Sequence, residues 1–137
     1  MYTAFGYALS RNKNSIDHLS SSIANRLSMF TGHVVNVSAL AAKLPRGGET
    51  HLMLKFDRHA YTADGERVNV FGPKGLSGGA LLDLGDFTSP AIYVSNSQHR
   101  ATLSGMLIEH RPAHRVMVAV KIGAIAEGIR RDLRSAQ

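Results

Sequence analysis

The sequence predicts an all-β fold, a single six-stranded antiparallel barrel followed by a C-terminal helix. Short apolar runs with alternating or β-branched residues recur along the chain, and turns rich in glycine and proline separate them. The last segment has the apolar spacing of an amphipathic helix. The 137 residues suit one domain, residues 1–137, with a single hydrophobic core.

Six segments are expected to form the core strands. Tyr2–Leu9 is aromatic and apolar, and Gly32–Leu40 is rich in valine, which favours strands. Thr50–Phe56 alternates between apolar and polar residues, as a half-buried strand does. The other three expected strands are Gly79–Leu84, Arg100–His110, whose Gly105 marks a bend or a close backbone approach, and Arg115–Ile122.

The remaining segments connect these strands. Ser15–Thr31 has apolar residues at three- and four-residue steps, which predicts a helix, but its serines favour an irregular loop instead. Asp57–Lys74 is a polar loop in which Val68–Val70 can pair briefly, and Gly85–Gln98 is an insertion. Gly123–Leu133 is an amphipathic helix with its apolar residues one turn apart.

Composition limits the classes of function. The chain has no cysteine, which excludes disulfides and thiolate metal sites, and no histidines at a metal-ligand spacing, so no metal or cofactor is expected. No apolar run approaches a membrane span, and the N-terminus lacks the features of a signal peptide, so a cytoplasmic location is favoured. The formal net charge of +6 can attract nucleic acid, but the basic residues are scattered apart from Arg130, Arg131 and Arg134.

The stretch Gly75-Leu76-Ser77-Gly78-Gly79 carries the chemistry. A serine between glycines lies in a tight turn, because glycine adopts backbone angles that other residues avoid. The Ser77 hydroxyl would then be accessible, and the amides of Gly75 and Ser77 can turn toward one point. A nucleophile beside converging N–H donors is what acyl transfer needs. The alternative is a glycine-rich hairpin turn in which the serine is incidental.

The sequence that follows this turn resembles a known family. KGLSGGA leads into LLDL, then into TLSGMLIEH and RVMVAVKIGAIAEGIRRDL. From Phe71 onward the chain is similar to the C-terminal half of trypsin-like (chymotrypsin-fold) serine peptidases of the divergent, cysteine-poor bacterial type. YTAFGYALS resembles, more weakly, the strand that opens their second barrel. The resemblance implies a nucleophile-bearing second barrel with Ser77 as nucleophile and the amides of Gly75 and Ser77 as oxyanion hole.

The same resemblance exposes what is missing. The family takes its catalytic histidine and aspartate from a first barrel, which is expected to be absent here, so the chain is either part of a longer protease or a domain that lost half of its site. Leu76 replaces the aspartate of many activated trypsins, so packing must hold the turn. In-chain substitutes would be His51 with Asp57, or His59 with Asp64, against the ordinary interpretation of solvated surface histidines; His99, His110 and His114 follow the serine. The resemblance also implies that the strand Gly105–His110 lines the substrate cleft next to Ser77. Glu109 or His110 could then contact a peptide side chain, but solvated positions at a strand end are the favoured expectation.

Three functions therefore compete. The first is a serine-type endopeptidase domain, a hydrolase acting on a peptide or protein, inactive by itself for want of a base. The second is a catalytically silent, protease-like binding or regulatory module. The third is a small basic barrel that binds nucleic acid, which the few dispersed aromatic residues disfavour. An uncovered face around Phe5 and Tyr7 predicts docking of a first-barrel segment or self-association, unless Ser15–Thr31 covers that face as a lid.

Overall fold

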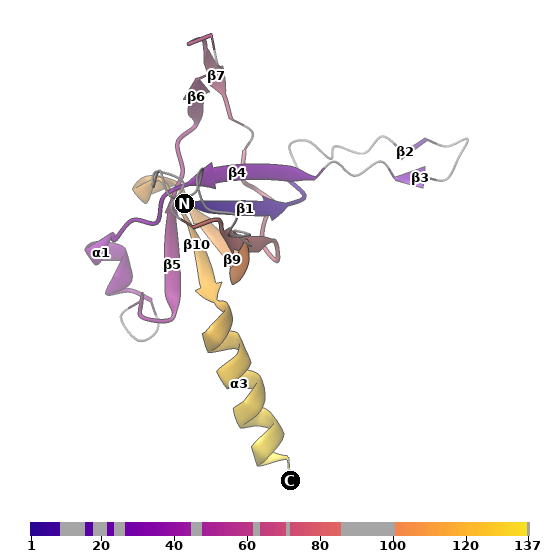
Figure 1. The fold of residues 1–137 in the computed structure, drawn as a ribbon, viewed down its shortest axis with the longest axis vertical. Helices are drawn as coiled ribbons and strands as arrows, with labels where there is room; N and C mark the ends of the chain where they lie inside the picture. The colour runs from indigo at the N-terminus through magenta and orange to yellow at the C-terminus, as the bar shows by residue number, and fades with distance from the viewer. Residues whose placement is uncertain are drawn as a thin grey trace, which may run out of the picture.

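The computed structural model describes residues 1–8, 16–17, 22–23, 27–44, 48–61, 64–70, 72–85 and 101–136. This part of the chain is mostly β, with a six-stranded antiparallel sheet that curls into a half-barrel and a helix at the C-terminal end (Figure 1). The strand order in the sheet is β4 (Ser28–Gly32), β1 (Tyr2–Gly6), β8 (Ala80–Asp83), β9 (Thr102–Arg111), β10 (Val116–Lys121) and β5 (His51–Lys55). The predicted β class, six-stranded antiparallel sheet and terminal helix are thus confirmed.

Five strands form in segments that were predicted as strands. They are β1 (Tyr2–Gly6), β5 (His51–Lys55), β8 (Ala80–Asp83), β9 (Thr102–Arg111) and β10 (Val116–Lys121). Gly105 lies where β9 approaches β10 closely, because a Cβ atom there would be 2.5 Å from the carbonyl oxygen of Val120. The helix α3 spans Ile122–Ser135.

The sixth strand, β4 (Ser28–Gly32), lies in the segment for which a helix was one of two expectations. Both expectations, a helix and an irregular loop, are wrong for these residues. β4 pairs along its whole length with β1, from Tyr2 opposite Gly32 to Gly6 opposite Ser28. The three- and four-residue spacing of the apolar residues favours a helix, and pairing with β1 overrides this local preference. Two short strands of the same segment, β2 (Ile16–Asp17) and β3 (Ser22–Ile23), pair with each other.

The strand predicted over Gly32–Leu40 is also wrong. Beyond β4 only an isolated bridge from Val34 to Leu54 remains, and the chain then forms the short helix α1 (Ser38–Ala41). The Val35 amide donates to the Met53 carbonyl at 2.8 Å, and the Lys55 amide donates to the His33 carbonyl at 2.9 Å. The segment after β4 therefore links one edge of the curled sheet to the other before it turns into α1.

The polar loop before the serine turn contains a hairpin. Its strands are β6 (His59–Tyr61) and β7 (Arg67–Asn69), and they extend the brief pairing expected near Val68–Val70. Figure 1 shows this hairpin on the side of the sheet opposite to α3. A 3-10 helix, η2 (Pro112–His114), joins β9 to β10. Of the expected insertion Gly85–Gln98, all but the first residue lies outside the described residues.

Two apolar clusters cover the two faces of the sheet. The larger one holds residues from five strands and the serine turn: Ala4, Ala8, Leu54, Phe56, Leu76, Leu81, Leu107, Met117 and Ala119. The smaller one holds Leu40, Met53, Val116 and Val118, so α1 packs on the opposite face of β5 and β10. The serine turn thus contributes to the main core through one of its own residues, Leu76.

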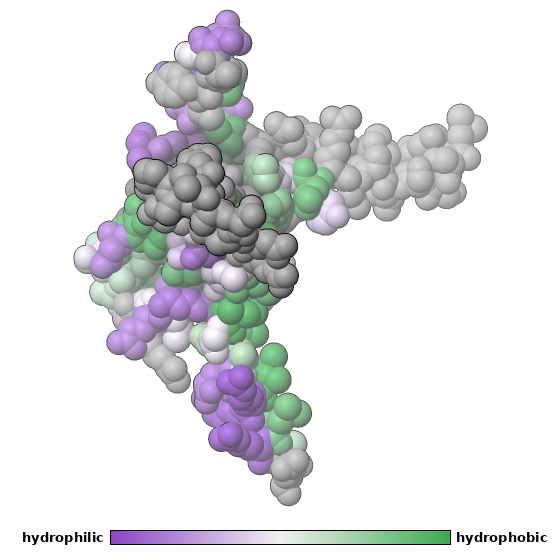
Figure 2. Space-filling view, in the orientation of Figure 1, coloured by the Kyte–Doolittle hydropathy of each residue, from purple (hydrophilic) through white to green (hydrophobic). Residues whose placement is uncertain are grey.

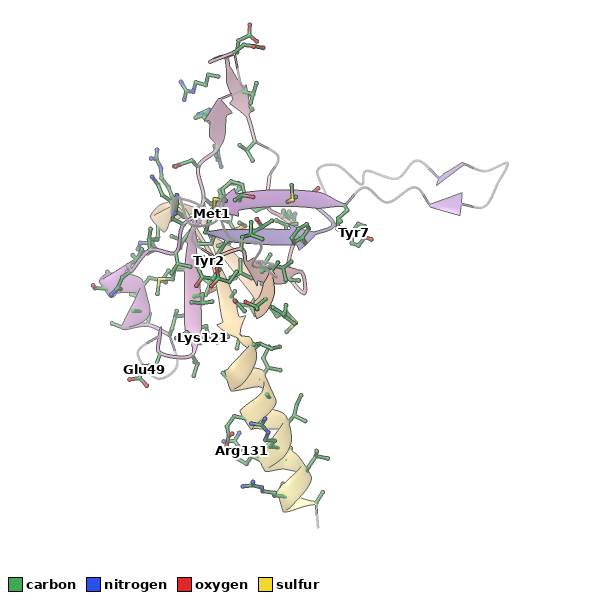
Figure 3. The ribbon with its side chains drawn as sticks, viewed as in Figure 1. Met1, Tyr2, Tyr7, Glu49, Lys121 and Arg131 are labelled. Carbon is green, nitrogen blue, oxygen red and sulfur yellow. The ribbon has the colours of Figure 1, made fainter. Side chains whose placement is uncertain are left out.

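The apolar side of α3 is largely uncovered. Ile129 and Leu133 are 56% and 65% exposed, and Figure 2 shows the apolar side of the helix next to its hydrophilic side. Another exposed apolar group lies at the other end of the sheet. Tyr7, just beyond β1 in Figure 3, is 54% exposed, and Leu27 and Met29 are exposed to a similar degree. Within the described ranges, no helix has the length and apolar character needed to cross a membrane.

We expect this exposed apolar surface to cause self-association. Contiguous apolar patches are uncommon on monomers, and exposed apolar surface drives association at micromolar to millimolar concentrations. Changing both Ile129 and Leu133 to Glu should shift the chain toward monomer in light scattering, while Arg131→Glu on the polar side should not. A parent chain that is cleanly monomeric at ~100 µM would contradict this expectation.

Candidate functional site

The predicted serine turn precedes β8 and has the backbone angles of a glycine turn. Gly75 and Gly78 have φ angles of 93° and 86°, in the left-handed region that favours glycine. Ser77 lies between them and is exposed, whereas Leu76 beside it is only 3% exposed. The turn therefore directs one side chain into the core and the next, with the hydroxyl, into solvent.

Packing and backbone hydrogen bonds hold the turn between β1 and β9. The Gly78 amide donates to the Leu107 carbonyl at 2.7 Å, and the Leu107 amide donates to the Gly79 carbonyl at 2.8 Å. Gly79 also lies against β1, since a Cβ atom there would collide with the carbonyl oxygen of Phe5. Leu76 fills the core beneath the turn.

The amides of the turn divide into two groups. Those of Leu76, Gly78 and Gly79 donate to the carbonyls of Pro73, Leu107 and Leu76, at 3.1, 2.7 and 2.9 Å. The amides of Gly75 and Ser77 have no acceptor among the described residues, and both residues are exposed. Within the turn, the two N–H groups expected to form an oxyanion hole are therefore the two that have no partner in the described part of the chain.

A β-bulge in β9 supplies the partner of the serine hydroxyl. Val118 of β10 lies opposite Glu109, but Ala119 lies opposite Leu107, so Ile108 is an extra residue. The Ser77 hydroxyl donates to the Ile108 carbonyl at 2.9 Å. Among the described residues no histidine is hydrogen-bonded to Ser77, so its proton is held by a backbone carbonyl and not by a base.

The bulge also places His110 beside the serine turn. Because Ile108 is extra, Leu107 and His110 face the same side of the sheet. They pair across the strands with Ala119 and Met117, which belong to the main core on that side. His110 lines a pocket of about 440 Å³ together with Ser77 and Met117, and its ring lies edge-on to Phe56 at 5.1 Å. Burial, and then the charge of Arg58, lower the pKa of His110 below its ordinary value.

The upstream histidines proposed as bases lie elsewhere. The His51 ring is 3.0 Å from the Thr50 hydroxyl, and Asp57 forms ion pairs with Lys55 at 3.3 Å and with Arg115 at 3.9 Å, so His51 and Asp57 do not pair. Neither His51 nor His59 lines the pocket of Ser77. His59 is exposed on β6 and lines two neighbouring pockets, and Asp64 is exposed near the end of the hairpin.

The structure decides between the two expectations for the downstream residues. Glu109 and His110 lie in the wall of the Ser77 pocket, as the expectation that their strand lines a cleft beside Ser77 requires, and the favoured expectation of solvated positions at a strand end is wrong. Glu109 also pairs with Arg111 at 2.8 Å. His114 lies in η2 outside this wall, and His99 lies outside the described residues. Only recognition of a bulge at Ile108 would have placed His110, and alternation hides such a bulge.

Comparisons of this chain with known proteins find no similar protein. A scan against protein-family models, a search of curated proteins and a search of solved structures each find no match to this chain. Among the described residues, no group of three or more histidines and carboxylates could hold a metal ion.

We expect the turn glycines to be essential to the fold for different reasons. Gly79→Ala should lower the free energy of unfolding by more than about 2 kcal/mol, because its Cβ atom meets the backbone of β1. Gly78 has open space around it, so Gly78→Val should cost about 1–3 kcal/mol through its φ angle alone. Gly78→Asn should cost less, since asparagine tolerates positive φ.

Gly128 in α3 is the control for this set. It also has open space and a helical backbone, so Gly128→Ala should stabilise the chain by up to about 1 kcal/mol. Urea unfolding measures all four variants. Equal stability of Gly79→Ala and the parent would show that the turn does not lie against β1.

We expect His110 to make the stability of the fold depend on pH. Its pKa is lower in the folded chain than the ordinary 6.5, so the unfolded chain binds the proton more readily. The free energy of unfolding should therefore decrease as pH falls through 6.5 to the lowered value, and level off below it. In an NMR titration Arg58→Gln should raise the pKa of His110 part of the way, because burial remains. An unchanged pKa in that variant would refute the charge contribution.

Proposed function

We propose that this chain is the nucleophile-bearing half of a serine-type peptidase site, with Ser77 as nucleophile and the amides of Gly75 and Ser77 as oxyanion hole. The single observation that carries the proposal is the pairing pattern of the turn. Two amides beside an exposed serine hydroxyl have no acceptor among the described residues, while the other amides of the turn are bonded within the fold. An oxyanion hole requires donors held in place before the charge develops.

The resemblance to trypsin-like peptidases supports the same interpretation. The curled six-stranded sheet with a C-terminal helix is compatible with the second barrel of such a peptidase. In that fold a first barrel would bring the base, and here the Ser77 hydroxyl is bonded to the Ile108 carbonyl instead. A pocket formed by Tyr7, Leu27 and the turn gives such a barrel, or a second copy, an apolar surface beside Ser77.

One observation favours a second candidate, the catalytically silent binding module. The Ser77 hydroxyl donates its hydrogen bond to a backbone carbonyl. His110 lines the same pocket but is not hydrogen-bonded to Ser77. In this case the pocket would bind a peptide without cleaving it. Both candidates share the expectation that the chain alone hydrolyses peptides little, since only the oxyanion hole and binding remain without a base.

A fluorophosphonate probe separates the two candidates. In mildly alkaline buffer, hydroxide takes the place of the missing base, and the phosphonyl oxygen of the adduct needs the same donors as an oxyanion. Ser77 should be labelled about 10²-fold faster than an ordinary serine, the value of one good oxyanion-hole donor. Mass spectrometry of the digested adduct locates the label, and Ser77→Ala should abolish it.

Ser135 is the internal control. It is exposed, and its hydroxyl donates to the Asp132 carbonyl at 2.9 Å, the same kind of bond at the same length as that of Ser77. It lies at the end of a helix and has no free amides on a turn. Equal labelling of Ser77 and Ser135 would reject the peptidase half and favour the silent module.

A further inference from the structure

The structure gathers basic residues that are scattered in the sequence. A pocket of about 510 Å³ next to the serine site is lined by Arg58, Arg67 and Arg115 together with His59 and His110. Lys74 lines the adjoining pocket. Arg58 comes from the loop after β5, Arg67 from the β6–β7 hairpin and Arg115 from the turn before β10, so only folding brings the three arginines together.

The pocket has an excess of positive charge. Asp57 is its one acidic residue among the described lining residues, and it is engaged by Lys55 at 3.3 Å and by Arg115 at 3.9 Å. Arg58 and Arg67 have no ion-pair partner among the described residues. The charge of Arg58 also lowers the pKa of His110, after the larger effect of burial, and both residues line this pocket.

The basic pocket is continuous with the pocket of Ser77. His110 and Pro112 line both the basic pocket and the Ser77 pocket. A third pocket lies between these two. It shares Arg58 and His59 with the basic pocket, and it shares Pro73 and Lys74 with the Ser77 pocket. A chain that extends past Ser77 along β9 would therefore place a nearby side chain among the arginines.

We propose that this basic pocket binds the carboxylate of an aspartate or glutamate side chain of a peptide that occupies the serine site. The inference rests on the proposed function for the nature of the ligand, a peptide. Arginine is suited to carboxylates because its planar guanidinium donates two parallel hydrogen bonds. A nucleic acid would need stacking surfaces, and among the described lining residues Phe56 is the one phenylalanine, tyrosine or tryptophan; it is buried and packed against Phe30 and His110.

Fluorescence anisotropy with two labelled peptides tests this proposal. The peptides differ only by Glu or Gln at one position, and the protein carries Ser77→Ala so that binding is measured without covalent chemistry. The Glu peptide should bind several-fold more tightly at low salt, and the difference should shrink as salt screens the charges. Arg58→Gln and Arg67→Gln should each remove much of the preference.

Arg131→Gln is the matched control. It removes the same charge from α3, which lies away from the hairpin (Figure 3), and should leave the preference unchanged. An equal loss in this variant would show that net charge alone attracts the peptide and would overturn the proposal. So would equal affinities for the two peptides, no binding of either, or tighter binding of a single-stranded oligonucleotide of the same charge.

Two further measurements keep the outcome clear. The Glu peptide should raise the pKa of His110 in an NMR titration of the otherwise unchanged chain, because a carboxylate then lies near the imidazole; an unchanged value would count against the pocket. Failure of Ser77 to label with a preserved preference for Glu would reject the peptidase half and retain the pocket. Labelling of Ser77 without a preference for the Glu peptide would retain the peptidase half and reject the carboxylate pocket.

Discussion

The serine turn depends on the two hydrogen bonds that it exchanges with Leu107 of β9, and the rest of the site follows from them. The bonds from Gly78 to Leu107 and from Leu107 to Gly79, at 2.7 and 2.8 Å, fix the turn against the sheet. Gly79 can take part only because it has no side chain where β1 passes. Leu76, held in the core, prevents the turn from rotating. The amides of Gly75 and Ser77, two exposed residues, are left without an acceptor among the described residues.

The bulge at Ile108 connects this turn to the surrounding surface. It frees a backbone carbonyl that accepts the serine proton, and it turns His110 toward the same side as Leu107. An extra residue in one strand thus sets both the resting state of the hydroxyl and the position of the nearest imidazole. The same histidine forms part of the wall shared with the basic pocket, so the proposed nucleophile and the proposed carboxylate site are parts of one continuous surface.

Much of the fold could be predicted from local pattern. Thr50–Phe56, the strand after the turn and the final strand and helix have clear periods, and these elements form within a few residues of the expected bounds. β4 was missed because the three-residue step from Leu27 to Phe30 favours a helix, and the pairing with β1 overrides this local period. The valines near Val35 were misleading for the converse reason, since two hydrogen bonds to β5 were enough to hold that segment before α1.

Only part of the candidate site could be predicted from the sequence. Glycine chemistry predicted the turn around Ser77, but His110 and the arginine pocket depend on a bulge and on the path of a hairpin, which leave no local signal.

Amide hydrogen exchange across the turn, measured by NMR, tests the central claim most directly. The account predicts slow exchange at Gly78 and Gly79 and nearly unprotected exchange at Gly75 and Ser77. Protection of Gly75 or Ser77 equal to that of Gly79 would mean that these amides are bonded within the fold, and the proposed oxyanion hole would not exist.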